Sequence, residues 1–140
     1  DTNLLIALLW SAHEQHDRAI NWFTRHRGKG WATCPLTEAG FVRIVSNPAF
    51  SRDAVQPREA IQVLCANTAA KDHQFWPDAI QLGAIGVAVR ARIARHNQVT
   101  DAYLLSLAIH RKARMVTFDR GLQSLAPKGS AEEKFLWLLV

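Results

Sequence analysis

The sequence predicts an α/β fold with a mostly parallel central sheet that is covered by helices on both faces. Short apolar runs alternate with longer segments of helical periodicity, a pattern typical of strands joined by helical crossovers. The chain has 140 residues, of which 49% are hydrophobic and 21% charged, so one well-packed core is expected. No repeat, linker or low-complexity segment divides the chain, and we expect residues 1–140 to form a single domain.

The first part of the chain predicts four helices and two short strands. Periodicity favours helices over residues 2–10, 16–27 and 57–70, and strands over residues 31–34 and 73–76. Pro35 breaks the first strand, Thr37 opens a further helix, and Asn47-Pro48 ends it. The helix over 16–27 is amphipathic, and its expected inward residues are Ala19, Ile20, Trp22 and Phe23.

The second part predicts a less regular segment followed by a clear helix between two strands. Gly83 and Gly86 interrupt a helical pattern over residues 78–96, so we expect a short helix, a kink or loop, and then a helix over 87–95. Thr100 is expected to cap a helix over 101–112. Residues 114–118 and 135–140 read as strands.

Four acidic residues stand where apolar patterns begin. Asp1, Glu38 and Asp101 each occupy position i of a stripe whose positions i+3, i+4 and i+7 are apolar, so each carboxylate begins the face that its helix buries. The stripes are Leu4, Leu5 and Leu8; Phe41, Val42 and Val45; and Leu104, Leu105 and Ala108. Asp119 follows the predicted strand over 114–118 and precedes Leu122, Leu125 and Ala126.

Carboxylates gathered in a cleft repel one another and lose hydration, so a positive charge must compensate them. Mg²⁺ and Mn²⁺ prefer carboxylate and water oxygens, and a site for them needs no cysteine or histidine. Any one of these acids is also explained by the preference of acids for the first turn of a helix. Only the set of four predicts a shared metal site.

The position of the acids along the predicted strands indicates where such a site lies. In parallel sheets, ligands bind beyond the carboxyl ends of the strands. Asp119 stands at a strand end, and Glu38 and Asp101 begin helices that could open onto the same crevice. Because a strand precedes this kind of acid elsewhere in the chain, we expect an opening strand before Asp1 that is missing from this sequence.

The charge balance favours a polyanionic partner. The formal net charge is +5, and sequestering four acids around a metal would leave the remaining surface more basic. Nucleic acid is the commonest partner of a basic surface, although charge alone does not settle function. No apolar run approaches the roughly 20 residues that cross a bilayer, and no secretion signal is present, so a cytoplasmic location is expected.

With these residues identified, the chain resembles the PIN-domain ribonucleases, and within them the VapC-type toxins of bacterial toxin-antitoxin pairs. The likeness spans nearly the whole chain, and the order and spacing of its short motifs are more specific than any one of them. The matching segments are Asp1-Thr2-Asn3-Leu4-Leu5, Thr37-Glu38 with Gly40-Phe41-Val42-Arg43, Val99-Thr100-Asp101-Ala102-Tyr103-Leu104, Thr117-Phe118-Asp119-Arg120-Gly121, and Phe75-Trp76-Pro77-Asp78.

The resemblance implies a three-layer α/β/α PIN-like fold, a homodimer, and four acids that hold Mg²⁺ or Mn²⁺ for cutting RNA with an activated water. Its acids match Asp1, Glu38, Asp101 and Asp119, and its supporting polar positions match Asn3 and Thr117. It also implies a VapB-type antitoxin as partner. We expect Asn3, Arg43 and Arg120 as RNA contacts, and Arg43 could equally pair with a site acid.

Other interpretations have less support in the sequence. A non-catalytic PIN-fold module that binds RNA or protein would have no reason to keep four repelling acids. His13 and His16 could share a metal, but no third ligand lies near them in the sequence, and Cys34 and Cys65 form no Cys-x-x-Cys pair. A phosphotransferase of the haloacid-dehalogenase type would carry a second aspartate where Asn3 stands.

Overall fold

The computed structural model describes residues 1–139, which form two compact units. One unit comprises Thr2–Pro77, and the other comprises Asp1 together with the chain from Asp78 onward. The four described strands pair in parallel, as the sequence predicts, and they form two separate two-stranded sheets, one in each unit. The predicted α/β class is therefore confirmed.

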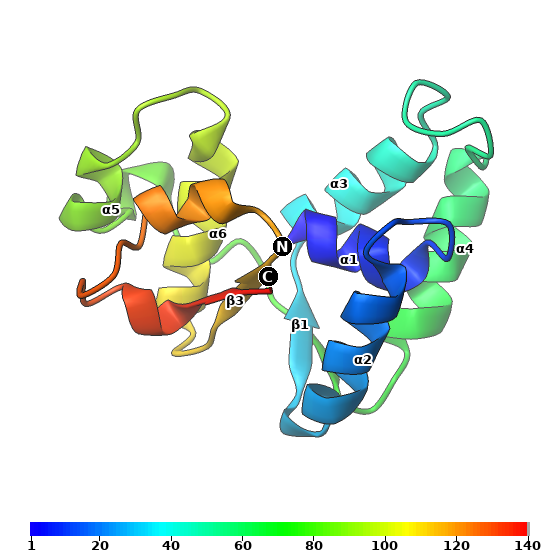
Figure 1. Ribbon diagram of the computed structural model, residues 1–140, viewed down its shortest axis with the longest axis horizontal. Coiled ribbons are helices and arrows are strands. Elements are labelled where there is room, and N and C mark those ends of the chain that lie inside the picture. The colour runs from blue at the N-terminus through cyan, green and yellow to red at the C-terminus, as the bar shows by residue number, and fades with distance from the viewer. Residues whose placement is uncertain (140) are drawn as a thin grey trace. The chain divides into compact units, whose positions relative to one another are not determined.

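The Thr2–Pro77 unit combines helices that pack against one another with a small parallel sheet (Figure 1). Its elements are α1 (Thr2–Leu9), α2 (His16–His26), a 3-10 turn (Arg27–Lys29), β1 (Trp31–Thr33), α3 (Pro35–Val45), α4 (Pro57–Thr68) and β2 (His73–Phe75). Helix α3 packs against both α1 and α4. The buried cluster between them consists of Leu5, Ile6, Phe41, Val45, Ala60 and Leu64.

Helix α3 begins at Pro35, two residues earlier than the sequence predicted. Cys34 is its N-cap, and the Thr37 hydroxyl accepts a hydrogen bond from the Cys34 backbone N–H at 3.0 Å. A proline is tolerated at the first helical position because its missing N–H would have no helical partner there. Thr37 therefore completes the cap within the first turn, and Pro35 starts the helix.

The closeness of α3 to α1 depends on a glycine. A Cβ atom at Gly40 would lie 2.9 Å from the Thr2 Cγ2 atom, closer than side-chain carbons approach. The absence of a side chain at Gly40 thus lets the beginning of α1 lie directly against α3.

Helix α2 buries less of its apolar face than the sequence predicted. Ala19 is fully buried, whereas Ile20 is 38% exposed. Trp22 and Phe23 are partly buried, and the Phe23 ring meets the Trp31 ring edge-on with centroids 5.2 Å apart. The prediction for Ile20 was wrong, because the position next to Ala19 is rotated about 100° around the helix and leaves the packed stripe.

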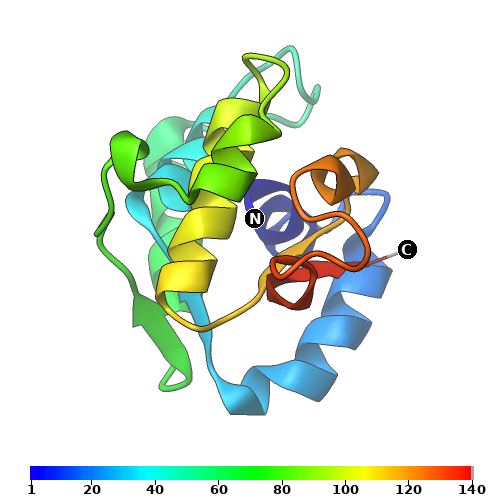
Figure 2. The ribbon, with the colours of Figure 1, turned by 90° about the vertical axis from the view of Figure 1, so that its left-hand side faces the viewer.

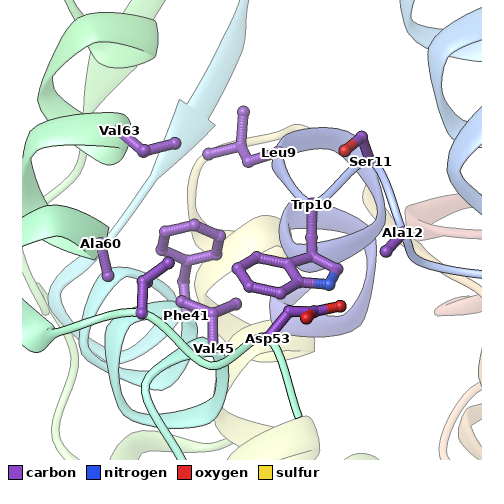
Figure 3. A pocket seen from close by; sticks show the side chains of 10 residues that line it. Leu9, Trp10, Ser11, Ala12, Phe41, Val45, Asp53, Ala60 and Val63 are labelled. Carbon is purple, nitrogen blue, oxygen red and sulfur yellow. The ribbon is translucent and has the colours of Figure 1, made fainter. Parts of the chain in front are cut away.

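A cavity of about 340 Å³ opens in this unit at the end of α1 (Figure 3). Its wall is mostly apolar and includes Trp10, Phe41, Val45 and Val55, while the carboxylate of Asp53 is among its few polar groups.

The second unit is built around helix α6 (Figure 2). Its elements are a 3-10 turn (Leu82–Ala84), α5 (Val87–Ala91), α6 (Gln98–His110), β3 (Met115–Thr117), a 3-10 helix (Arg120–Ser124), a 3-10 turn (Glu133–Phe135) and β4 (Leu136–Leu138). Strand β4 is shorter than the predicted 135–140, and Val140 lies outside the described residues. The predicted stripe of Leu104, Leu105 and Ala108 is buried, as are Leu122, Leu125 and Ala126.

The boundary between α5 and α6 differs from the prediction. Helix α5 ends at Ala91, and the Arg92 guanidinium then donates to the Leu125 carbonyl at 3.0 Å and to Glu132 at 2.8 Å. The side-chain carbonyl of Gln98 accepts from the backbone N–H groups of Ala94 and Arg95. These contacts turn the chain before Gln98, so α6 starts there and Thr100 lies inside the helix, where it was wrongly predicted as the cap.

Within residues 1–139, no helix has both the length and the apolar character needed to cross a membrane.

Candidate active site

Two of the predicted aspartates meet through a buried hydroxyl at the end of β3. The Thr117 side chain donates to the Asp1 Oδ2 atom at 2.7 Å and accepts from the Asp119 backbone N–H at 3.0 Å. The backbone nitrogen of Asp1 also donates to the Val116 carbonyl at 3.2 Å. Because Thr117 is fully buried, water does not compete for these bonds. The strand end therefore fixes Asp1 and Asp119 together.

Asp119 is held by the turn that follows it. It caps the 3-10 helix Arg120–Ser124, and its Oδ1 atom accepts from the Gly121 backbone N–H at 2.7 Å. A Cβ atom at position 121 would lie 3.0 Å from the same oxygen. Gly121 thus allows the backbone to approach the carboxylate closely, which explains the glycine two residues after the acid.

Asp101 lies in the first turn of α6 and is partly buried. Burial raises the pKa of its carboxyl above the ordinary 3.8, the negative charge of Asp119 raises that pKa further, and the α-amino group of residue 1 acts in the opposite direction. Asp101 and Asp119 are therefore close enough for their charges to interact. The structure brings these two aspartates and Asp1 into one neighbourhood.

Glu38 belongs to the other unit, where it takes part in a separate network. It lies in the first turn of α3, and its Oε1 atom accepts from the Thr33 hydroxyl at 2.6 Å. The same hydroxyl oxygen lies 2.8 Å from the Nε2 atom of His73. Burial lowers the pKa of the His73 ring below the ordinary 6.5, while the negative charge of Glu38 opposes this shift.

Sequence reasoning missed Thr33 and His73. The available signal was weak: Thr33 closes a strand five residues before Glu38, and His73 opens another strand. Nothing in the sequence states that these strands are neighbours. The parallel pairing of Trp31 with His73 and of Thr33 with Phe75 brings the two side chains together.

The remaining predicted residues occupy more open positions. Asn3 is partly exposed in the first turn of α1. Arg43 on α3 and Arg120 at the start of its 3-10 helix are exposed. Neither arginine forms an ion pair with an acid that the structure describes. The alternative role of Arg43 as a partner of a site acid therefore has no support among these contacts.

The donor set can be compared with the needs of a metal. Over residues 1–139, no group of three or more His, Cys, Asp or Glu side chains is arranged to hold a metal ion. The chemistry of the aspartates nevertheless fits a hard divalent cation, which takes oxygen ligands and would relieve the repulsion between Asp101 and Asp119. His13 and His16 make local bonds instead: His13 Nδ1 accepts from the Gln15 N–H, and His16 Nδ1 lies 2.8 Å from the Ala7 carbonyl.

Comparisons with known proteins identify the family of the chain. The family model for the PIN domain matches residues 1–128. The chain is 42% identical over 132 residues to Ribonuclease VapC39 of Mycobacterium tuberculosis, an alignment that covers 94% of this chain and 95% of that protein. It is 46% identical over 126 residues to Ribonuclease VapC38 of the same organism, covering 90% and 87%. Ribonuclease VapC44 is 38% identical over 133 residues, covering 95% and 93%.

Proposed function

This chain belongs to the PIN domain family, and from that premise we propose that it is a metal-dependent endoribonuclease that acts as the toxin of a toxin-antitoxin pair. The observation that carries the proposal is the half-buried Asp101, whose pKa is raised by burial and by the charge of Asp119. Carboxyl groups with a pKa raised by burial and by a like charge are concentrated at functional sites, and a bound metal ion would relieve the repulsion. The names of the relatives described above, which are ribonucleases, support RNA as the substrate.

We assign Asp1, Asp101 and Asp119 as ligands of Mg²⁺ or Mn²⁺. Thr117 presents two of them by donating to Asp1 and accepting from the Asp119 backbone. When bound, the cation supplies an activated water and neutralises charge that develops on the phosphate. Glu38 serves as a further ligand or orients the attacking water, and no side chain is required as nucleophile.

The basic residues and the partners complete this proposal. Arg43 and Arg120 are proposed to contact RNA, because exposed guanidinium groups bind phosphate oxygens in a bidentate manner. Asn3 is proposed as a further RNA contact through its side-chain amide. A VapB-type antitoxin is the proposed protein partner, and a homodimer within the cytoplasm is the proposed working form. We further propose that residues 1–140 act as a single PIN-like domain.

The experiment that tests the function replaces one carboxylate with an amide of the same shape. We expect Asp101→Asn to fold normally and to lose RNA cleavage in Mg²⁺ or Mn²⁺, because the amide carries no charge to hold the cation. Cleavage of total RNA by purified wild-type protein, with and without EDTA, provides the reference. The exposed Asp17 on α2 offers a matched control, and Asp17→Asn should cut like the wild type.

A second measurement separates catalysis from binding alone. Mn²⁺ should raise the melting temperature of the wild-type protein, and this increase should disappear in Asp101→Asn. If Asp101→Asn still cuts RNA at the wild-type rate, the assignment of Asp101 as a ligand of the catalytic metal is wrong. RNA binding by the wild type without any cleavage, at every metal tested, would favour the non-catalytic module instead.

A further inference from the structure

We propose that Thr33 and His73 are positioning residues for Glu38, in which His73 fixes the Thr33 hydroxyl and that hydroxyl orients the carboxylate. The inference rests on the proposed function, because that function assigns Glu38 to the catalytic site. It concerns two residues that none of the sequence motifs includes.

The distances define a continuous chain of hydrogen bonds. The Thr33 Oγ1 atom lies 2.6 Å from Glu38 Oε1 and 2.8 Å from His73 Nε2. A hydroxyl has one hydrogen to donate, and an ionised carboxylate can only accept. The hydrogen of Thr33 must therefore point to Glu38, and the hydroxyl oxygen must accept from His73.

This direction determines which ring nitrogen of His73 carries a proton. For this arrangement the Nε2 atom, which faces Thr33, must carry a proton, a condition met by the neutral Nε2–H tautomer and by the imidazolium. The backbone of Thr68 also hydrogen-bonds to the ring and competes for that proton in the neutral form. With a proton on Nδ1 alone, Nε2 would accept the hydrogen of Thr33, and Glu38 would lose its donor. The position of the proton on the His73 ring thus decides whether the Thr33 hydroxyl donates to Glu38.

The surroundings keep both residues in place. Thr33 is 5% exposed, so water has little access to its hydroxyl, and its carbonyl accepts from the Trp76 backbone N–H at 2.8 Å. The His73 ring packs against the Trp31 ring, with centroids 4.5 Å apart. Because β1 and β2 pair in parallel at these positions, backbone and side chain together restrict the geometry. A carboxylate in the first turn of a helix gains a fixed orientation from such a support.

The first test removes the hydroxyl without changing the shape of the side chain. Thr33→Val should lower kcat for RNA cleavage by about ten- to a hundredfold, the usual effect of losing a partner that orients a site residue, while KM stays nearly constant. Thr33→Ser restores the hydroxyl and should restore most of the rate. Thr24→Val, at an exposed position of α2, is the matched control and should match the wild type.

A second pair of variants tests the donor. His73→Leu removes it and should lower kcat in the same direction, whereas His73→Gln can place an amide N–H near the original Nε2 atom and should retain more activity. If Thr33→Ser is as impaired as Thr33→Val, or if His73→Gln is as impaired as His73→Leu, the hydrogen-bond chain is not what matters and the inference is overturned.

The decisive readout needs neither metal nor RNA. Nitrogen-15 NMR of the histidine rings in the metal-free wild-type protein should find Nε2 of His73 protonated. A ring protonated on Nδ1 alone overturns the inference even if the protein cuts RNA. Conversely, Glu38→Gln with full cleavage activity would refute the role of Glu38 in the proposed function, whatever the NMR result.

Discussion

The carboxylates of the two units are held in contrasting ways. In the unit that contains α6, Asp101 is partly buried beside the like charge of Asp119, and the pKa of Asp101 is raised as a result. In the Thr2–Pro77 unit, Glu38 accepts a short hydrogen bond from the neutral hydroxyl of Thr33. The negative charges of Asp101 and Asp119 thus repel each other, whereas Glu38 is stabilised by a hydrogen bond from Thr33.

In the proposed metal-dependent function, this difference assigns two separate tasks to the carboxylates. Mutual repulsion leaves an affinity for a cation, because a bound ion relieves it. A carboxylate that accepts a hydrogen bond from a neutral donor keeps its orientation without the ion. We therefore expect substitutions in the two units to differ in their effects on metal affinity and on stability.

The largest expected effect is on catalysis. Asp119→Asn and Glu38→Gln should each lower kcat by roughly a thousandfold, since several kcal/mol of charge stabilisation corresponds to about that factor. Mn²⁺ should raise the melting temperature, and we compare the midpoint, which is the concentration that gives half of this rise. Asp119→Asn should increase that concentration clearly more than Glu38→Gln does. Metal titration of both variants by thermal melting measures this, and equal midpoints would remove the proposed division of tasks.

An intermediate effect is expected from the hydroxyl that joins Asp1 and Asp119. Thr117→Val leaves the partly buried Asp119 backbone N–H without its acceptor, which should lower the free energy of unfolding by about 1–2 kcal/mol. Urea unfolding in EDTA provides the measurement. Thr117→Ser should recover most of the loss, and a Thr117→Val variant as stable as the wild type would contradict this account.

The smallest expected effect is a change in melting temperature that has opposite signs in the two units. Without metal, Asp101→Asn should raise the melting temperature by a few degrees at neutral pH, because it removes a partly buried charge that faces a like charge. Glu38→Gln should lower it slightly, because the bond from Thr33 loses its charge assistance. Melting curves in EDTA at one pH compare the two, and changes of the same sign would contradict the contrast.

The dependence of stability on pH provides a further test of the prediction for Asp101→Asn. The pKa of Asp101 is higher in the folded protein than its ordinary 3.8, so the folded state holds this proton more tightly. Its contribution to stability is fully present below pH 3.8 and is lost as the pH rises through the raised folded value. Asp101→Asn should remove this part of the dependence, and the difference between the two melting curves should grow with pH across that window.

Much of the fold follows from local patterns in the sequence. The stripe Leu104, Leu105 and Ala108 is buried as predicted, and the strands over 31–34 and 114–118 form within one or two residues of their expected ends. The start of α6 was predicted wrongly because a side chain acts on a neighbouring turn, as Gln98 does when it accepts from the backbone of Ala94 and Arg95. Such bonds depend on where the chain folds back, which periodicity does not report.

The site was predictable in part for the same reason. Asp1, Glu38, Asp101 and Asp119 are recognisable because each begins an apolar pattern, and the bond from Thr117 to Asp1 then places two of them together. The support of Glu38 by Thr33 and His73 was not predictable, since the residues are forty positions apart and meet only through strand pairing.

The sequence by itself determined the α/β class and most of the apolar positions that the helices bury, and it singled out the four acids as candidates, because these depend on residue type and on the repeat of a helix or strand. The tertiary structure alone decided which strands pair and which way the hydrogen bonds around each carboxylate run. It also decided that Asp101 faces the charge of Asp119 while Glu38 faces a hydroxyl. The physical reason is that charge interactions and hydrogen bonds depend on distances in space, and residues far apart along the chain acquire those distances only on folding.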